Sequence, residues 1–228
     1  MKIGLYSAHR LSFLLRQTPS GLGLWGSNSF EFNPIEEDVL VVIDDLMGPQ
    51  ETRVQPSRRI LVVTEPPEIR RYEPSFLEQF GLVLSPYPLE VPSESLIITQ
   101  SALPWFYGVC FDEDLGKLDA SFEDLLAQRP TKKLNAVSVV CSTKHRLPRH
   151  KERLALLEYL HVHLKDRLVI KGRGFDHIND KSDAIEPFAY HLVLENTDVG
   201  HFWTEKLADA YLGWAFPICL LYTSDAAD

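Results

Sequence analysis

Two cations in this sequence stand where helices are expected to begin. Lys206 falls in the first turn of a helix expected from about residue 203, and Arg153 falls in the first turn of a helix expected over 150–164. A helix start has free backbone amides and the positive end of the dipole, so a cation there costs a few tenths to about 1 kcal/mol. Beside those amides, however, a cation could help to hold an anion. Both positions are therefore candidates for a phosphate site.

Each cation also has an ordinary explanation. Lys206 could be solvated or paired with Asp209 or Asp198, and Arg153 could be a surface residue, because surface ion pairs are common and weak. Helical spacing predicts that the apolar positions of the later helix form its buried face: Trp203, Leu207, Ala210, Tyr211 and Trp214.

A carboxylate is fixed at the end of one expected strand. The apolar run 60–63 predicts a buried strand, and Thr64-Glu65-Pro66-Pro67 follows it. The prolines stop the strand and exclude helix at Glu65, because the residue before a proline avoids the α region. Ligands of α/β sheets bind beyond the carboxyl ends of strands, although an ordinary sheet-edge Glu fits the same pattern.

A pair of acidic residues, Asp44 and Asp45, follows the apolar run 39–43. A phospho-receiver domain has such a pair, but it also needs a further strand-end Asp and a strand-end Lys, which the sequence does not place. We therefore expect Asp44 and Asp45 to form a solvated loop or a helix cap.

The strands and helices that must position these residues predict an α/β protein. Short apolar runs alternate with helical patterns and loops, which is the signature of parallel strands joined by crossovers. The runs expected to be strands are 3–6, 39–43, 60–63, 82–84, 96–99, 136–141, 168–170, 190–194 and 216–218. A helix could also begin over 9–16, before Thr18-Pro19-Ser20-Gly21 breaks it.

The segment 188–218 carries a family resemblance. Glu195-Asn196-Thr197, a short spacer and then FWTEKLADAYLGWAFPI resemble the signature of glycosyltransferase family 10, the α-1,3/1,4-fucosyltransferases. The matching positions are Glu195, Asn196, Thr204, Glu205, Lys206, Leu207, Ala210, Pro217 and Ile218. Gly213 is displaced by one position, Thr197 stands for the usual Ser, and Phe202 stands for the usual Tyr.

The resemblance implies two Rossmann-like domains in a GT-B arrangement, the second of them incomplete. We expect an acceptor-side domain over 1–112, an acidic linker and helix over 113–134, and a donor domain over 135–218. Residues 219–228 end in LYTSDAAD, which resembles a translated adapter, and we expect them to be non-native.

The resemblance also implies a reaction, the inverting transfer of L-fucose from GDP-fucose to a hydroxyl of a glycan acceptor. Glu65 matches the family's catalytic base, and Arg153 and Lys206 match residues that neutralise the diphosphate. Glu205 would accept hydrogen bonds from the ribose, and Asn196 would support the sugar or the phosphates.

Further donor contacts are implied for Glu195 and for Phe202, which lacks the hydroxyl of the usual Tyr. That difference leaves another nucleotide sugar, or a non-catalytic nucleotide- or glycan-binding module, as alternatives. The candidates for donor loops are Ser142 and Lys144 after 136–141, and Gly172 and Arg173 after 168–170, where glycines allow close backbone approach.

No metal or other cofactor is expected. Asp112-Glu113-Asp114 matches the Asp-x-Asp pattern of metal-dependent glycosyltransferases, but no convincing apolar strand precedes it, and we interpret it as a solvated acidic turn.

Composition narrows the partners and the compartment. The formal net charge of −9 and the pI near 5.4 disfavour nucleic acid as a partner, while a local basic site for one phosphate is compatible with them. The three cysteines have no paired spacing, so we expect reduced thiols. Without a signal peptide or a membrane-spanning run, the expected location is the bacterial cytoplasm. Peripheral association with membrane-bound acceptors at the inner membrane face is a second option.

Overall fold

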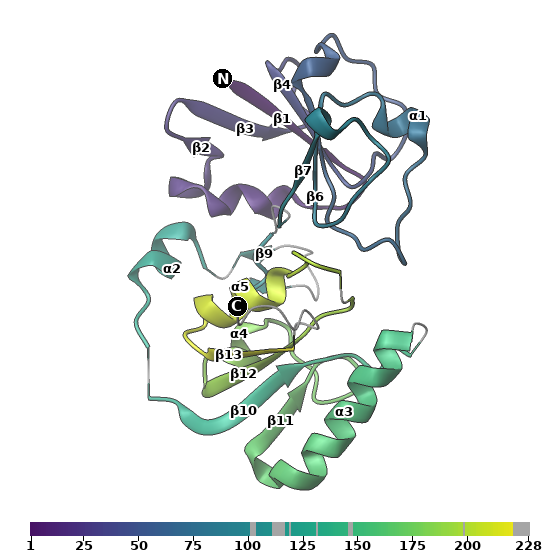
Figure 1. Cartoon of the computed structure of the whole chain (residues 1–228). Helices are drawn as coiled ribbons and strands as arrows, with labels where there is room; N and C mark the ends of the chain where they lie inside the picture. The colour runs from purple at the N-terminus through teal and green to yellow at the C-terminus, as the bar shows by residue number, and fades with distance from the viewer. Residues whose placement is uncertain are drawn as a thin grey trace. The chain divides into compact units, whose positions relative to one another are not determined.

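Internal contacts divide the protein into two compact units, each built on a sheet of mainly parallel strands (Figure 1). The first unit comprises Met1–Pro104 with Ser121–Glu123 and Val199–Phe202, and the second comprises the rest of the chain. The computed structural model describes residues 1–100, 104–110, 117–118, 120–130, 132–145, 148–197 and 199–220. The expected α/β class is confirmed, whereas the GT-B arrangement and the domain bounds stay predictions.

The first unit contains a seven-stranded sheet in the order β2-β3-β1-β4-β5-β6-β7. All neighbouring strands are parallel except the β2–β3 hairpin. The strands are β1 (Lys2–Ser7), β2 (Leu24–Trp25), β3 (Asn28–Phe32), β4 (Val39–Ile43), β5 (Arg59–Val62), β6 (Leu82–Ser85) and β7 (Leu96–Ile98). The chain leaves β1 toward β3 on one side and returns to β4 on the other, so β1 and β4 flank a topological switch point.

Buried aliphatic side chains of the central strands form the core of this unit. Val42, Leu61, Val63 and Val83 are almost fully buried and belong to one hydrophobic cluster. The helical connections are short: α1 (Pro74–Leu77) and the 3-10 helices Ser12–Gln17, Pro19–Gly21, Pro56–Arg58 and Ser93–Ser95. The helix expected over 9–16 is thus a 3-10 helix that begins three residues later and ends before Thr18-Pro19.

The second unit contains a four-stranded parallel sheet in the order β11-β10-β12-β13. Its strands are β10 (Leu134–Val140), β11 (Leu168–Lys171), β12 (Phe188–Leu194) and β13 (Phe216–Leu220). Its helices are α2 (Phe122–Ala127), whose first residues count with the first unit, α3 (Pro148–Leu164), α4 (Ser182–Ile185) and α5 (Glu205–Leu212). A separate antiparallel pair joins β8 (Val109–Cys110) and β9 (Lys117–Leu118).

Alternation along β12 divides its side chains between two faces. Leu192 and Leu194 pack in a cluster with Leu157 of α3, which lies along the sheet beside β10 and β11 (Figure 1). His191 and Val193 alternate with them and are also buried. A strand that is buried on both faces reads as a continuous apolar run, as the sequence indicated.

The structure corrects the expected buried face of α5. The helix begins at Glu205 rather than near residue 203, and Tyr211 is 64% exposed. Trp214, 47% exposed, lies beyond the end of the helix and has a φ of 55°. Ala210 is buried as expected, and so is Asp209, which pairs with Lys181.

Cys219 and Leu220 lie in β13 and pair with Val193 and Leu194 of β12. The rest of the expected non-native segment, 221–228, lies outside the described residues. All three cysteines are free thiols. Among the described residues, no helix is long and apolar enough to cross a membrane.

Candidate functional site

Candidate residues of the second unit gather at the carboxyl edge of its sheet. The chain passes from β10 to β11 on one side and to β12 on the other, so β10 and β12 flank the switch point where open α/β sheets bind ligands. Asn196 follows β12 directly after Glu195, and Arg153 is on α3, the helix that follows β10.

Arg153 and Asn196 are joined at this switch point. Nη1 of Arg153 donates a hydrogen bond to Oδ1 of Asn196. Nε of Arg153 and Oγ1 of Thr197 are buried and have no hydrogen-bond partner among the described residues. An unpaired buried polar atom costs roughly 1–3 kcal/mol, so a ligand or an ordered water bound here would be stabilised by these atoms.

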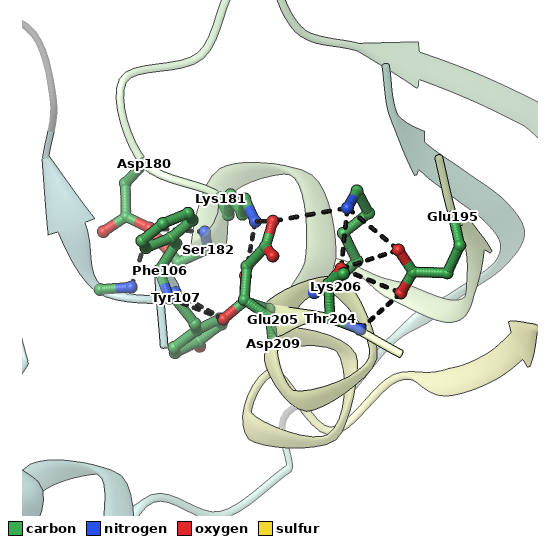
Figure 2. A network of polar contacts seen from close by, with 11 residues as sticks. Phe106, Tyr107, Asp180, Lys181, Ser182, Glu195, Thr204, Glu205, Lys206 and Asp209 are labelled. Carbon is green, nitrogen blue, oxygen red and sulfur yellow. Dashed lines mark hydrogen bonds and ion pairs between the residues drawn. The ribbon is translucent and has the colours of Figure 1, made fainter. Parts of the chain in front are cut away.

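Lys206 is held by the residue that precedes Asn196 (Figure 2). Its Nζ lies 3.1 Å from Oε2 of Glu195 and 2.8 Å from Oγ1 of Thr204. Glu195 is buried and also accepts hydrogen bonds from the backbone N–H of Thr204 at 2.8 Å and from its hydroxyl. Thr204 is the N-cap of α5 and accepts from the N–H of Lys206.

These contacts explain why a cation is tolerated at the start of α5. The Glu195 carboxylate offsets both the charge of Lys206 and the positive end of the dipole. Both Glu195 oxygens are engaged inside the protein, so its direct role is to hold the start of the helix. Its predicted contact with a donor stays a prediction. Asp209, one of the two partners weighed from the sequence, pairs with Lys181 instead, and the other, Asp198, lies outside the described residues.

The two cations act on the same thiol. Burial raises the pKa of Cys141, at the end of β10, while the charges of Arg153 and Lys206 both oppose that rise. Neighbouring cations also act on His150, whose pKa is lowered by burial and by repulsion from Arg153 and Lys144. Arg153 and Lys206 therefore both lie close enough to the end of β10 to act on the groups there.

The two candidate donor loops lie side by side. The N–H of Cys141 donates to the carbonyl of Lys171 at 2.9 Å, and the N–H of Thr143 donates to the carbonyl of Arg173 at 3.1 Å. A Cβ on Gly172 would lie 2.4 Å from the Cys141 carbonyl oxygen, so this glycine is required by loop packing. Within these loops Ser142 is half-buried, whereas Lys144 and Arg173 are exposed.

Glu205, the first residue of α5, lies in a network of ion pairs. Its Oε1 is 3.3 Å from Nζ of Lys181 and 3.7 Å from Nζ of Lys206. Burial raises the pKa of Glu205, but Lys181 and then Lys206 lower it, and the result is about 2. Glu205 is therefore a carboxylate at neutral pH. Lys181 was not among the expected site residues, because it is 24 residues away in sequence and carries no motif of its own.

In the first unit, Glu65 is positioned by a buried carboxylate. The N–H groups of Thr64 and Glu65 donate to Oδ1 of Asp44 at 2.6 and 3.1 Å, and the Thr64 hydroxyl donates to Oδ2. The hydroxyl of Tyr72 also donates to Oδ1 at 3.1 Å. On the other side, the hydroxyl of Tyr87 donates to the Glu65 carbonyl at 3.2 Å.

The expectation of a solvated loop at Asp44 is therefore wrong. Asp44 is 3% exposed and has a φ of 57°, a left-handed conformation that aspartate tolerates better than most residues. Its neighbour Asp45 does lie near the surface and pairs with Arg70 at 2.5 Å. Asp44 follows β4 at the switch point of its sheet and fixes the loop that carries Glu65.

Not all expected site residues are brought together. Arg153, Glu195, Asn196, Glu205 and Lys206 belong to the second unit, as do the donor loops. Glu65 and the buried Phe202 count with the first unit, and their place opposite the cations stays a prediction. The Asp112–Asp114 pattern lies outside the described residues.

No protein-family model matches this chain, and no curated protein does. Solved structures of α1,3-fucosyltransferase are similar to it. One with GDP-fucose has a TM-score of 0.47 and 18% identity, over 96% of this chain and 68% of that one. One with GDP has a TM-score of 0.49 and 17% identity, over 96% and 67% of the two chains. Identities and TM-scores this low establish neither a family nor an activity for this chain.

Proposed function

We propose that this protein is an inverting glycosyltransferase that moves L-fucose from GDP-fucose to a hydroxyl of a glycan acceptor. The observation that carries the proposal is the pair of cations at the switch point of the second sheet. There Arg153 and Lys206 are anchored to the consecutive residues Asn196 and Glu195. The segment that provides these anchors is the one whose residues resemble the fucosyltransferase signature.

The proposed chemistry uses side chains alone. The bond between C1 of fucose and the β-phosphate oxygen breaks, while a bond forms from C1 to the acceptor oxygen on the opposite face. Arg153 and Lys206 stabilise the negative charge that the departing GDP gains. Arginine suits this role because its planar fork can hold two phosphate oxygens. Glu205 accepts hydrogen bonds from the ribose, and Glu65 takes the proton that the acceptor hydroxyl loses.

Donor identity is the first point to test, because Phe202 stands where the fucosyltransferase signature has a tyrosine. Isothermal titration calorimetry with GDP, UDP and CMP should show binding of GDP at least tenfold tighter than the other two. Preferential binding of UDP or CMP would indicate a glycosyltransferase with another donor. Absence of binding by all three would overturn the proposal of a nucleotide-sugar site.

Glu65→Gln tests the proposed base. The amide keeps the size of the side chain but cannot accept a proton, so transfer to a glycan acceptor should fall about 10²- to 10⁴-fold. GDP affinity should stay within about twofold, because Glu65 has no proposed donor contact. Glu68→Gln, an exposed change three residues away, is the matched control. Transfer at the rate of the unchanged protein would exclude Glu65 as the base.

A further inference from the structure

Lys181 is a half-buried cation between two carboxylates of α5 (Figure 2). Its Nζ lies 2.7 Å from Oδ2 of Asp209 and 3.3 Å from Oε1 of Glu205, and 4.8 Å from the centre of the Phe106 ring. The Lys181 side chain is 17% exposed and that of Asp209 is not exposed at all. The two carboxylates raise the pKa of Lys181 against the effect of burial, so the lysine is charged.

Asp209 holds the Lys181 side chain in place, because Asp209 is itself fixed by the backbone. Oδ1 of Asp209 accepts hydrogen bonds from the backbone N–H groups of Phe106 and Tyr107 at 2.8 and 2.9 Å. Its other oxygen contacts Lys181, so the carboxylate is engaged on both sides. The neighbouring Asp180 accepts from the N–H groups of Gly108 and Ser182 through Oδ1 and fixes the backbone beside Lys181.

Stability alone does not account for this network. Asp209 is fully buried beside two partly buried charges, and the desolvation penalty of such a group often exceeds the attraction it gains. Replacement of a buried ion pair by apolar side chains of similar volume is often neutral or stabilising. One member of the network, Glu205, occupies the first turn of α5 next to Lys206, at the site proposed for a diphosphate. The network thus connects Lys181, which Asp209 holds in place, to a carboxylate at the start of the helix.

We propose that Lys181 is a positioning residue for donor recognition, which holds the Glu205 carboxylate in one orientation toward the vicinal ribose hydroxyls of a nucleoside diphosphate. Both ion pairs of Glu205 use Oε1, so Oε2 takes part in neither. A carboxylate fixed through one oxygen presents the other in a defined direction, which reduces the ordering cost of binding. This inference rests on the proposed function, because it assigns Glu205 to the ribose.

The test compares GDP with 2′,3′-dideoxy-GDP by calorimetry. The unchanged protein should bind GDP about tenfold to a hundredfold tighter, as expected for hydrogen bonds to a charged group. In Lys181→Met this ratio should fall to within about threefold of unity, because Glu205 loses its fixed partner. Lys133→Met is the matched control. Its Nζ donates to the carbonyls of Glu186 and Gly213 rather than to carboxylates, so the ratio should be retained.

Lys181→Met leaves the buried Asp209 carboxylate without its cation, and this variant could fail to fold. A second variant keeps the test valid in that case. The double variant Lys181→Met/Asp209→Asn removes both charges of the buried pair, and the amide oxygen can still accept from Phe106 and Tyr107. It should show the same loss of discrimination. If either folded variant keeps the full ratio of GDP affinity to 2′,3′-dideoxy-GDP affinity, the positioning role of Lys181 is overturned, while the proposed function is not. Equal affinity of the unchanged protein for both nucleotides, or no affinity, overturns the ribose assignment of Glu205 and this inference with it.

Discussion

Consecutive residues at the end of β12 hold the two cations of the second unit. The sequence drew attention to Arg153 and Lys206 because each was expected in the first turn of a helix, where a cation opposes the dipole. Lys206 does lie in the first turn of α5, whereas α3 begins at Pro148, which places Arg153 in its second turn. Their partners could not be found in the same way, since Asn196 is 43 residues from Arg153 and Glu195 is 11 from Lys206. Local chemistry thus indicated the site, and only the folded chain shows what organises it.

Removal of one cation should weaken nucleotide binding. Lys206→Ala is expected to lower GDP affinity about tenfold to a hundredfold, because a charge-assisted contact contributes about 1.5–3 kcal/mol. Calorimetry at low and at moderate salt would measure the loss, and the salt dependence should decrease in the variant.

Lys151→Ala provides the control for net charge. Lys151 is exposed on α3 and its loss changes the protein charge by the same amount. If both variants bind GDP equally well, Lys206 has no part in holding the diphosphate.

At the scale of elements, buried strands were the most predictable part of the fold. The run 39–43 is β4 with the same bounds, and the helix expected over 150–164 is α3 (Pro148–Leu164). Buried parallel strands and long periodic helices leave strong apolar patterns. The buried face of α5 was predicted less well, because a fully buried Asp209 violates the apolar pattern and is explained only by distant partners, Lys181 and the backbone N–H groups of Phe106 and Tyr107.

The burial of Asp44 is a second feature that the apolar pattern of the sequence did not predict. A carboxylate after a strand reads as solvent-exposed, because the charge is costly to bury unless donors surround it. Those donors come from Thr64, Glu65 and Tyr72, more than 19 residues away in sequence. Asp44, at the end of β4, therefore fixes the backbone at the end of β5, where Glu65 lies.

Asp44→Ala should destabilise the first unit by about 3 kcal/mol, the order expected when buried donors lose a shared acceptor. Urea unfolding followed by tryptophan fluorescence would give the change. Asp44→Asn should lose less, because its amide oxygen can replace Oδ1.

The neighbouring Asp45→Ala is the control for this change. Asp45 forms a partly exposed ion pair with Arg70, and such pairs contribute at most about 1 kcal/mol. Equal loss of stability in Asp44→Ala and Asp45→Ala would contradict the supporting role of Asp44.

At the scale of the whole molecule, both units share one feature of sheet topology. In each sheet, the chain crosses to both sides of the first central strand, β1 or β10. Polar side chains meet beyond the carboxyl ends of strands near that point, after β4 and β5 in the first unit and after β12 in the second. Apolar runs specify the sheets, so α/β class follows from sequence. The polar contacts that make each edge specific connect distant residues, and a single sequence does not reveal them.

The stability of the folded protein should depend on pH through one buried histidine. His191 is 3% exposed, with Nδ1 2.8 Å from Oγ of Ser138, and burial together with the charge of Lys181 lowers its pKa to about 3. Above pH 6.5 the side chain is neutral in both states and contributes no pH dependence. Below pH 6.5 the unfolded chain binds a proton that the folded protein does not, so stability falls by about 1.4 kcal/mol per pH unit.

Between pH 6.5 and pH 5 this amounts to a loss of about 2 kcal/mol, above the range in which most carboxylates titrate. Urea unfolding at several pH values should show that His191→Gln, which cannot titrate, has lost this slope, whatever its stability at pH 7. His161→Gln, an exposed change on α3, should keep it. If the unfolding free energy of His191→Gln still falls with the same slope, another group causes the pH dependence. The burial of neutral His191 is then not what destabilises the protein in acid.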